Sequence, residues 1–371
     1  MKILPFKLER FFAKYEFKAP YLLCTSDCES MPIEDLLNME LGSFEKFHKT
    51  WLGYTQSQGS PELRCEITKL YEKINIEDIL VHSGAEEAIF IFMNSMLKSG
   101  DHIIVHYPCY QSLFEIANSI GCNVTKWETF EKDNWELDIN TLKQSININT
   151  KAIIINCPHN PTGYQMSNDT LQEIVDIARE HNILIFSDEV YRFLEFDEKD
   201  RLPAACDIYE NAVSLGVMSK TFGLAGLRIG WIATKNAEVY REMASFKDYT
   251  SICNSAPSEF LASLALRNKS MLIKRNKNIV LSNIKILNEF FAKYENLFNW
   301  TAPKAGPIAF PSIKIGVDIE KFCIDLVEKK GVLLLPGNYY DFGHENFRIG
   351  FGRLNMPQCI EKLDEYLKDC R

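Results

Sequence analysis

The sequence lacks several features that would indicate particular partners or locations. It has no uncharged apolar run of the roughly 18 residues that a membrane-spanning helix needs. It has no strongly basic run either, because 41 Lys and Arg residues face 50 Asp and Glu residues, for a net charge of -9. The first twenty residues include Lys7, Glu9, Arg10 and Lys14, too many charges for a secretory signal. We therefore expect neither a membrane nor nucleic acid among its partners.

The cysteines form no recognisable metal-ligand or disulfide pattern. There are eleven of them, scattered along the chain, and none forms a Cys-x-x-Cys pair. Cys24 and Cys28 are the closest two, and no histidine follows them at metal-ligand spacing. The sequence therefore predicts reduced thiols in a cytoplasmic protein, and no metal site.

The first 250 residues contain short apolar runs that alternate with amphipathic, helix-like segments. Seven such runs read as strands, at residues 79–81, 102–106, 122–124, 152–155, 183–186, 212–217 and 227–233. Buried apolar strands separated by helices are typical of an α/β domain. We predict a seven-stranded, mostly parallel sheet with helices on both faces. The last strand follows its neighbour without a helix between them, which allows at least one antiparallel pair.

The pattern changes near residue 249. A long helical segment at 257–294 is interrupted around Lys269, and it precedes a strand at 308–315, a helix at 318–330, strands at 332–335 and 347–351, and a helix at 357–368. This succession predicts a smaller α+β domain. We divide the chain into a large domain at 41–255 and a small domain formed by 1–40 together with 256–371.

The densest chemical signal lies between the last two predicted strands of the large domain. There, Ser219 and Lys220 precede three closely spaced glycines, and Arg228 follows in the same segment. Glycines let a backbone fold tightly around a bound group, and a guanidinium suits a phosphate. For Ser-Lys alone, a surface lysine in a glycine-rich loop would be the simpler interpretation.

Three other turns follow strands and carry polar residues. Ser83-Gly84-Ala85-Glu86 opens a helix and is a candidate anion site through free backbone N–H groups, although a plain turn would look the same. The turn at 160–163 has the sequence Asn-Pro-Thr-Gly. Asp188 ends a strand, where an acidic residue can also simply cap the next helix.

Together, and in this order, these motifs resemble those of the class I/II aminotransferases of fold type I, the aspartate aminotransferase superfamily. The resemblance extends over nearly the whole chain. It implies that Lys220 holds pyridoxal 5'-phosphate (PLP) as a Schiff base. It also implies an enzyme that moves an amino group from an amino acid to an α-keto acid.

The resemblance assigns further roles by position. Asp188 would keep the ring nitrogen of PLP protonated, Asn160 and Tyr191 would reach its phenolic oxygen, and Tyr110 would stack on its ring unless it is simply a core residue. The residues expected at the phosphate are Ser83, Gly84, Ala85, Glu86, Ser219 and Arg228. Arg348 would clamp the substrate α-carboxylate, beside Asn160. Tyr54 would reach the cofactor phosphate and the substrate of a neighbouring subunit, which implies a homodimer with shared active sites.

The match departs from the family at several positions. Val217 stands where the family often has a hydroxyl residue at the phosphate, so that contact is lost or supplied elsewhere, for example by Ser219. Asp27 and Glu29 stand in a segment that usually carries glycine and proline, and they either favour a basic or polar substrate or are solvated loop charges. These departures leave open another PLP reaction on the same scaffold, such as a C–S β-lyase or a cyclising or synthase enzyme. A non-catalytic PLP-fold regulator is the less favoured reading, because no basic recognition helix is present.

Overall fold

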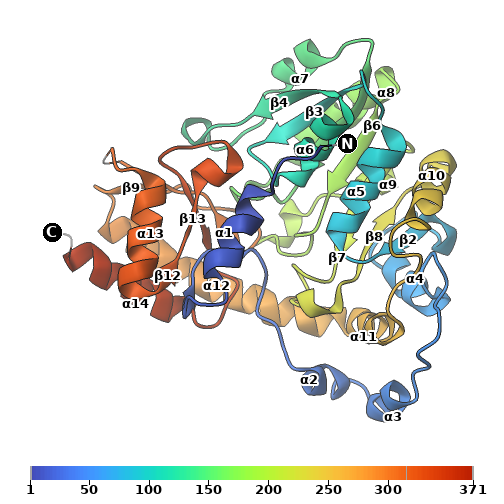
Figure 1. Ribbon diagram of the computed structural model, residues 1–371, viewed down its shortest axis with the longest axis horizontal. Helices are drawn as coiled ribbons and strands as arrows, with labels where there is room; N and C mark the ends of the chain where they lie inside the picture. Colours follow the sequence, from blue (N-terminus) through green and yellow to red (C-terminus); the bar gives the residue numbers. More distant parts are fainter. Residues whose placement is uncertain (1, 315, 370–371) are drawn as a thin grey trace.

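The computed structural model describes residues 2–314 and 316–369, and its centre is a seven-stranded sheet (Figure 1). The strand order is β2-β8-β7-β6-β5-β3-β4. The strands are β2 (Ile79–His82), β3 (His102–Tyr107), β4 (Asn123–Glu128), β5 (Thr150–Asn156), β6 (Leu184–Asp188), β7 (Ala212–Val217) and β8 (Gly230–Ala233). All pairs are parallel except those of β8, which runs antiparallel to both β7 and β2. The predicted sheet, including its antiparallel member, is confirmed.

Helices cover both faces of this sheet, as the apolar strands require. Alternate residues of β5 point to opposite sides, so Ala152 and Ile154 join one buried cluster whereas Ile153 and Ile155 join another. The first face is covered by α5 (Ala85–Met96), α6 (Ser112–Ile120) and α10 (Ala237–Lys247). The second is covered by α7 (Ile139–Ser145), α8 (Asn168–Glu180) and α9 (Ala205–Ile208).

One predicted strand begins later than expected. Residues 225–227 form a single 3-10 turn, and Arg228 has a left-handed backbone with φ 50°. That conformation cannot continue a ladder, so β8 starts at Gly230 instead of residue 227. The prediction was wrong at this end because the extended apolar pattern hides a turn.

The second half of the chain is α+β, with two helices in a row followed by short strands. The predicted long helix is α11 (Ala256–Arg267) and α12 (Lys269–Lys293), with the break at Asn268. The later elements are β9 (Phe298–Asn299), β10 (Ile308–Ala309), β11 (Ser312–Ile313), α13 (Ile319–Lys330), β12 (Val332–Leu333), β13 (Leu335–Pro336), β14 (Phe347–Gly350) and α14 (Met356–Asp369). The predicted helices and strands of this part are thus present, although two strands are divided.

Each divided strand has a local cause. The strand predicted at 308–315 is interrupted at Pro311, which has no N–H to donate to a ladder, and residue 315 lies outside the described residues. The strand predicted at 332–335 changes partner at Leu334. Leu333 pairs in parallel with Leu22, whereas Leu335 pairs antiparallel with Arg348.

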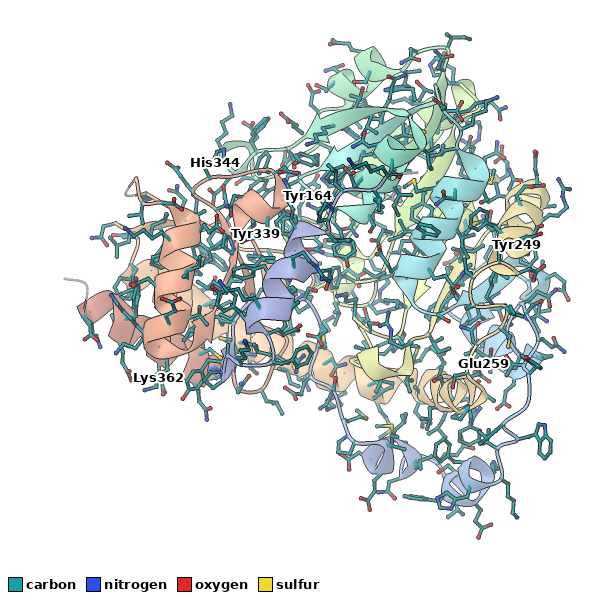
Figure 2. All side chains as sticks on the ribbon, viewed as in Figure 1. Tyr164, Tyr249, Glu259, Tyr339, His344 and Lys362 are labelled. Carbon is teal, nitrogen blue, oxygen red and sulfur yellow. The ribbon has the colours of Figure 1, made fainter. Side chains whose placement is uncertain are left out.

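The N-terminal segment crosses to the second half of the chain. Strand β1 (Tyr21–Leu22) pairs with β12, and α1 (Lys7–Tyr15) lies over the junction between the C-terminal part and the central sheet (Figure 1). Figure 2 shows Tyr339 beside α1, where its ring centroid lies 4.8 Å from that of Phe11. The chain then continues through α2 (Ile33–Leu37), α3 (Ser43–His48) and α4 (Pro61–Thr68). The exact division at residues 40/41 and 255/256 stays a prediction.

Across residues 2–314 and 316–369, none of the helices combines the length and apolar character required to span a bilayer.

Candidate active site

A cavity of about 370 Å³ opens where α1 covers the carboxyl ends of the central strands. Its walls come from α1 and the segment at 25–27, from the start of α5, from the end of β6, from the loop after β7, and from β14. Ten of the thirteen predicted site residues line it: Ala85, Glu86, Tyr110, Asn160, Asp188, Tyr191, Ser219, Lys220, Arg228 and Arg348. Residues up to 340 positions apart in sequence thus meet in one cavity, since Leu8 and Arg348 both line it.

Lys220 lies at the centre of this cavity. Its Nζ donates a 2.7 Å hydrogen bond to the hydroxyl of Ser26. Burial lowers the pKa of Lys220, and the neighbouring Arg348 adds to this effect, whereas Asp27 and Asp188 oppose it. An amine with a lowered pKa is more readily neutral, and therefore more nucleophilic, than an exposed lysine.

Asp188 ends β6 with its carboxylate in the cavity, and only 6% of the residue is exposed. The backbone N–H of Val190 donates a 3.2 Å hydrogen bond to its Oδ1. Burial raises the pKa of Asp188 to about 7, against the opposing effects of Val190 and Lys220. This carboxyl is short of a cationic partner. The neighbouring Glu189, by contrast, points away and accepts hydrogen bonds from Ala205 and Ser214, which is a structural role.

The start of α5 and Arg228 form a cradle suited to an anion. Ala85 is the first residue of the helix, so its N–H and that of Glu86 have no partner inside the helix. Gly84 precedes it with φ 93°, and a Cβ built there would lie 2.6 Å from Nη2 of Arg228. The guanidinium therefore packs where only glycine leaves room. Val217 and Ser219 also line the cavity, so the hydroxyl of Ser219 is available where Val217 offers none.

Arg348, on β14, is the most buried charge in the cavity, with 2% of the residue exposed. Its Nε donates to the carbonyl of Cys24 at 3.0 Å, and its Nη1 donates to the hydroxyl of Tyr340 at 2.7 Å and to Oδ1 of Asn160 at 3.3 Å. Tyr340 also donates to the same Asn160 oxygen at 3.2 Å. No hydrogen bond or ion pair of the described residues uses Nη2 of Arg348, which leaves one edge of the guanidinium for a ligand.

Two phenols complete the walls. The hydroxyl of Tyr110 donates to Oε1 of Glu9 at 3.1 Å, and the hydroxyl of Tyr191 donates to the carbonyl of Ser26 at 2.9 Å. Burial raises the pKa of both tyrosines, so both remain neutral hydrogen-bond donors at physiological pH.

Three predicted site residues do not line the cavity. The N–H of Ser83 donates to Oε2 of Glu87 at 2.6 Å. Gly84 does not line the cavity, but its lack of a side chain leaves room for the guanidinium of Arg228. Tyr54 is 93% exposed and lies on the surface of the single chain. Its predicted contact requires a second subunit and stays a prediction.

The sequence did not predict several residues that contact or line the site, among them Glu9, Glu16, Ser26 and Tyr340. Leu8, Phe12 and Glu16 recur at four-residue spacing along and just after a short amphipathic helix. This pattern is a signal that could have identified Glu16 and its neighbour Glu9 on the inner face. Asp27 and Glu29, which could either face the substrate or be solvated loop charges, differ in their surroundings. Asp27 lines the cavity and pairs with Arg353 at 2.8 Å, whereas Glu29 accepts a hydrogen bond from the backbone of Leu354.

A partly buried lysine and a buried aspartate on neighbouring strand ends, with an anion cradle and a buried arginine, define a cofactor-dependent enzyme of the α/β class. The sequence profile of the family described as aminotransferase class I and II matches residues 21–367, and the chain belongs to this family.

Individual proteins agree with this assignment. The chain is 29% identical over 330 residues to an aspartate aminotransferase of Pyrococcus horikoshii, covering 85% of this chain and 81% of that one. The structure of a PLP-dependent aminotransferase from Streptococcus suis superposes with a TM-score of 0.94 and 33% identity, covering 100% and 99% of the two chains. The PLP-dependent cyclase OrfR superposes with a TM-score of 0.90 and 25% identity, covering 100% and 99%. Family membership makes this protein a PLP-dependent enzyme of the aminotransferase type.

The cavity fits PLP on its own chemistry. The anion cradle at Gly84, Ala85 and Arg228 suits the phosphate, and the Asp188 carboxyl, whose pKa is raised by burial, suits a protonated ring nitrogen. Lys220 supplies the amine. Across residues 2–314 and 316–369, no group of three or more His, Cys, Asp or Glu residues is arranged to hold a metal ion.

Proposed function

We propose that this enzyme transfers the amino group of an amino acid to an α-keto acid, with Lys220 as the group that carries the cofactor and moves the proton. The observation that supports this most directly is the shared cavity of Lys220, Asp188 and Arg348. When bound, PLP supplies an electron sink that stabilises negative charge at the substrate α-carbon.

The protein residues divide the remaining work. The amine of Lys220, with its lowered pKa, acts as a general base and accepts the proton from the substrate α-carbon. The resulting ammonium then acts as a general acid and donates that proton to complete the transfer. The negative charge of Asp188 would hold a proton on the ring nitrogen. Ala85, Glu86, Ser219 and Arg228 would bind the phosphate, and Tyr110, Asn160 and Tyr191 would hold the ring and its phenolic oxygen.

Arg348 orients the substrate. Its fixed Nε and Nη1 contacts leave Nη2 for the α-carboxylate, so the carboxylate position is set before the reaction begins. This orientation helps to select which bond at the α-carbon is positioned to break. Asn160 shares Tyr340 with Arg348 and belongs to the same binding group.

The test uses an absorption spectrum and an isotope. The purified protein loaded with PLP should show a visible band that Lys220→Ala lacks. An amino acid labelled with ¹⁵N should pass its label to an added α-keto acid, giving a new labelled amino acid. A missing band, or label that never reaches the acceptor, would contradict the proposal.

A second candidate is a cyclising or lyase reaction on the same scaffold, and the likeness to the cyclase OrfR favours keeping it. The same labelled substrate distinguishes transamination from a lyase reaction and from a cyclisation. A lyase releases the label as ammonia together with a keto acid, whereas a cyclase retains the label in a product that forms without any acceptor.

We also propose a homodimer in the cytoplasm. Support for the dimer comes from large exposed hydrophobic side chains around Tyr54, with Trp51 85% and Leu52 82% exposed. Tyr249, visible beside α10 in Figure 2, is 88% exposed as well. Surface of this kind is typical of an interface between subunits. The cytoplasmic location rests on the unpaired thiols that the sequence predicts.

A further inference from the structure

Basic and acidic side chains lie on different faces of helix α1. Its basic residues, Lys7, Arg10 and Lys14, are exposed to solvent. Its acidic residue Glu9 and the following Glu16 line the cavity instead, beside the buried Leu8 and Phe12. A surface helix normally keeps all its charges on the outer face, so two carboxylates on the inner face of α1 need a reason.

These carboxylates form one group with Asp27, which we name the acidic wall (Glu9, Glu16 and Asp27). All three line the same cavity as Lys220. Burial raises the pKa of Glu16, and the charges of Glu9 and Asp27 raise it further, whereas Arg353 and Arg348 lower it.

The wall is only partly neutralised within the chain. Asp27 pairs with Arg353, with Nη2 to Oδ2 at 2.8 Å. Glu9 accepts one hydrogen bond, from the neutral phenol of Tyr110. Glu16 makes neither a side-chain hydrogen bond nor an ion pair with any residue of 2–314 or 316–369. Two negative charges in the cavity thus lack a cation.

The cavity also contains a positive charge, the guanidinium of Arg348. Arg348 is buried, with 2% of the residue exposed, and none of the described residues forms a hydrogen bond or ion pair with its Nη2. With Asp188 and Arg228 assigned to the cofactor and Glu86 bonded to Ser112, the cavity offers Nη2 of Arg348 and the carboxylates of Glu9 and Glu16 to a substrate.

We propose that the substrate is an amino acid whose side chain carries a cation, an ammonium or a guanidinium, and that Glu16 and Glu9 bind this cation while Arg348 binds the α-carboxylate. This proposal rests on the proposed function. A dicarboxylic amino acid fits poorly, since its second carboxylate would meet like charges without a cation to neutralise it. The substrate preference of this chain therefore differs from that named for the aspartate aminotransferase it resembles.

The test compares amino acids of similar length by spectral titration of the PLP-loaded protein. Lysine, ornithine and arginine should change the visible band at concentrations at least roughly tenfold lower than uncharged norleucine, because a charge-assisted hydrogen bond contributes that much or more. Aspartate and glutamate should be weaker than norleucine. Which of lysine, ornithine and arginine acts at the lowest concentration tells ammonium from guanidinium.

Variants locate the effect. Glu16→Gln and Glu9→Gln should each reduce the preference for the cationic substrate over norleucine by on the order of tenfold. Glu34→Gln removes an exposed carboxylate on α2 and should leave the preference unchanged. Retention of the visible band and of norleucine binding shows that a variant is folded, and Glu16→Asp should restore part of the preference.

The outcomes are distinct. A response to norleucine or aspartate equal to or stronger than that to lysine, ornithine and arginine would overturn the substrate assignment while leaving the proposed function intact. An unchanged preference in both variants would overturn the role of the acidic wall. A protein whose band responds to no amino acid at all would remove the proposed function itself.

Discussion

The amine of Lys220 donates a 2.7 Å hydrogen bond to the hydroxyl of Ser26, a residue 194 positions earlier in the chain. The carbonyl of the same serine accepts a hydrogen bond from Tyr191 at 2.9 Å. Ser26 thus fixes both the reacting amine and one of the phenols at the cofactor site. It is a positioning residue, because it acts through Lys220.

Replacing Ser26 should slow the covalent attachment of PLP. In Ser26→Ala the amine loses its acceptor and samples more rotamers, so we expect the visible band to form more slowly by on the order of tenfold. The rate is measured by adding PLP to protein freed of cofactor. Ser26→Thr retains the hydroxyl and should recover much of the rate, and Ser30→Ala, at an exposed serine, should show no change. Equal rates in all four proteins would rule out a positioning role.

Gly84→Ala should weaken PLP binding. The new Cβ would lie 2.6 Å from Nη2 of Arg228 and would displace the guanidinium from the phosphate cradle. We expect the dissociation constant for PLP to rise by on the order of tenfold or more, measured by fluorescence or absorbance titration.

The chain contains a matched control for this change. Gly100 has a similar positive φ, 89° against 93°, but no atom within 4 Å of its added Cβ. Gly100→Ala should therefore cost about 1–2 kcal/mol of folding stability through the left-handed backbone, and leave PLP affinity unchanged. A similar loss of affinity in both variants would mean that backbone strain, not the contact with Arg228, explains the effect.

Asp188→Asn should alter how the stability of the cofactor-free protein depends on pH. The folded pKa of Asp188 is about 7, whereas an aspartate in an unfolded chain titrates near 4. Between these values the unfolded state loses the proton and the folded state keeps it, so folding becomes less favourable as pH rises. Above about pH 7 this loss is complete, and it amounts to on the order of 4 kcal/mol at most.

Unfolding temperatures measured at pH 5 and pH 8 test this. Without cofactor, Asp188→Asn should gain stability relative to the unmodified protein as pH increases, while Asp35→Asn, at an exposed site, should not. With PLP bound the order should reverse, because the variant lacks the negative charge for the ring nitrogen. A variant that follows the unmodified protein at both pH values would show that the carboxyl ionises without cost.

Mixed dimers test the predicted role of Tyr54. In a shared-site dimer, Lys220→Ala and Tyr54→Ala each disable a site, yet a mixed dimer of the two retains one site with both native residues. Co-expression of differently tagged chains should therefore yield activity that neither variant shows alone. Mixed dimers as inactive as the separate variants, or activity that sediments as a monomer, would contradict shared sites.

The sequence predicted the sheet from local apolar patterns, and motifs that resemble those of the family predicted many of the residues that line the cavity. Strands such as β5 are continuous apolar runs, and Lys220 and Asp188 lie in motifs at strand ends. Ser26 and Tyr340 escaped prediction, since their importance comes from hydrogen bonds to Lys220 and Arg348 across large sequence separations. The late start of β8 was missed for a local reason, the left-handed backbone of Arg228, which an arginine in an apolar run does not reveal.

The pairing of β1 with β12 has a consequence for how the enzyme matures. Ser26 lies four residues after the end of β1, so the segment that carries the acceptor for Lys220 is paired only after the ribosome has synthesised the chain past Leu333. Arg348 is made later still. A nascent chain can therefore form its central sheet and its phosphate cradle well before it can align the amine that captures the cofactor. Attachment of the cofactor at its full rate therefore requires the C-terminal part of the chain as well as the central sheet.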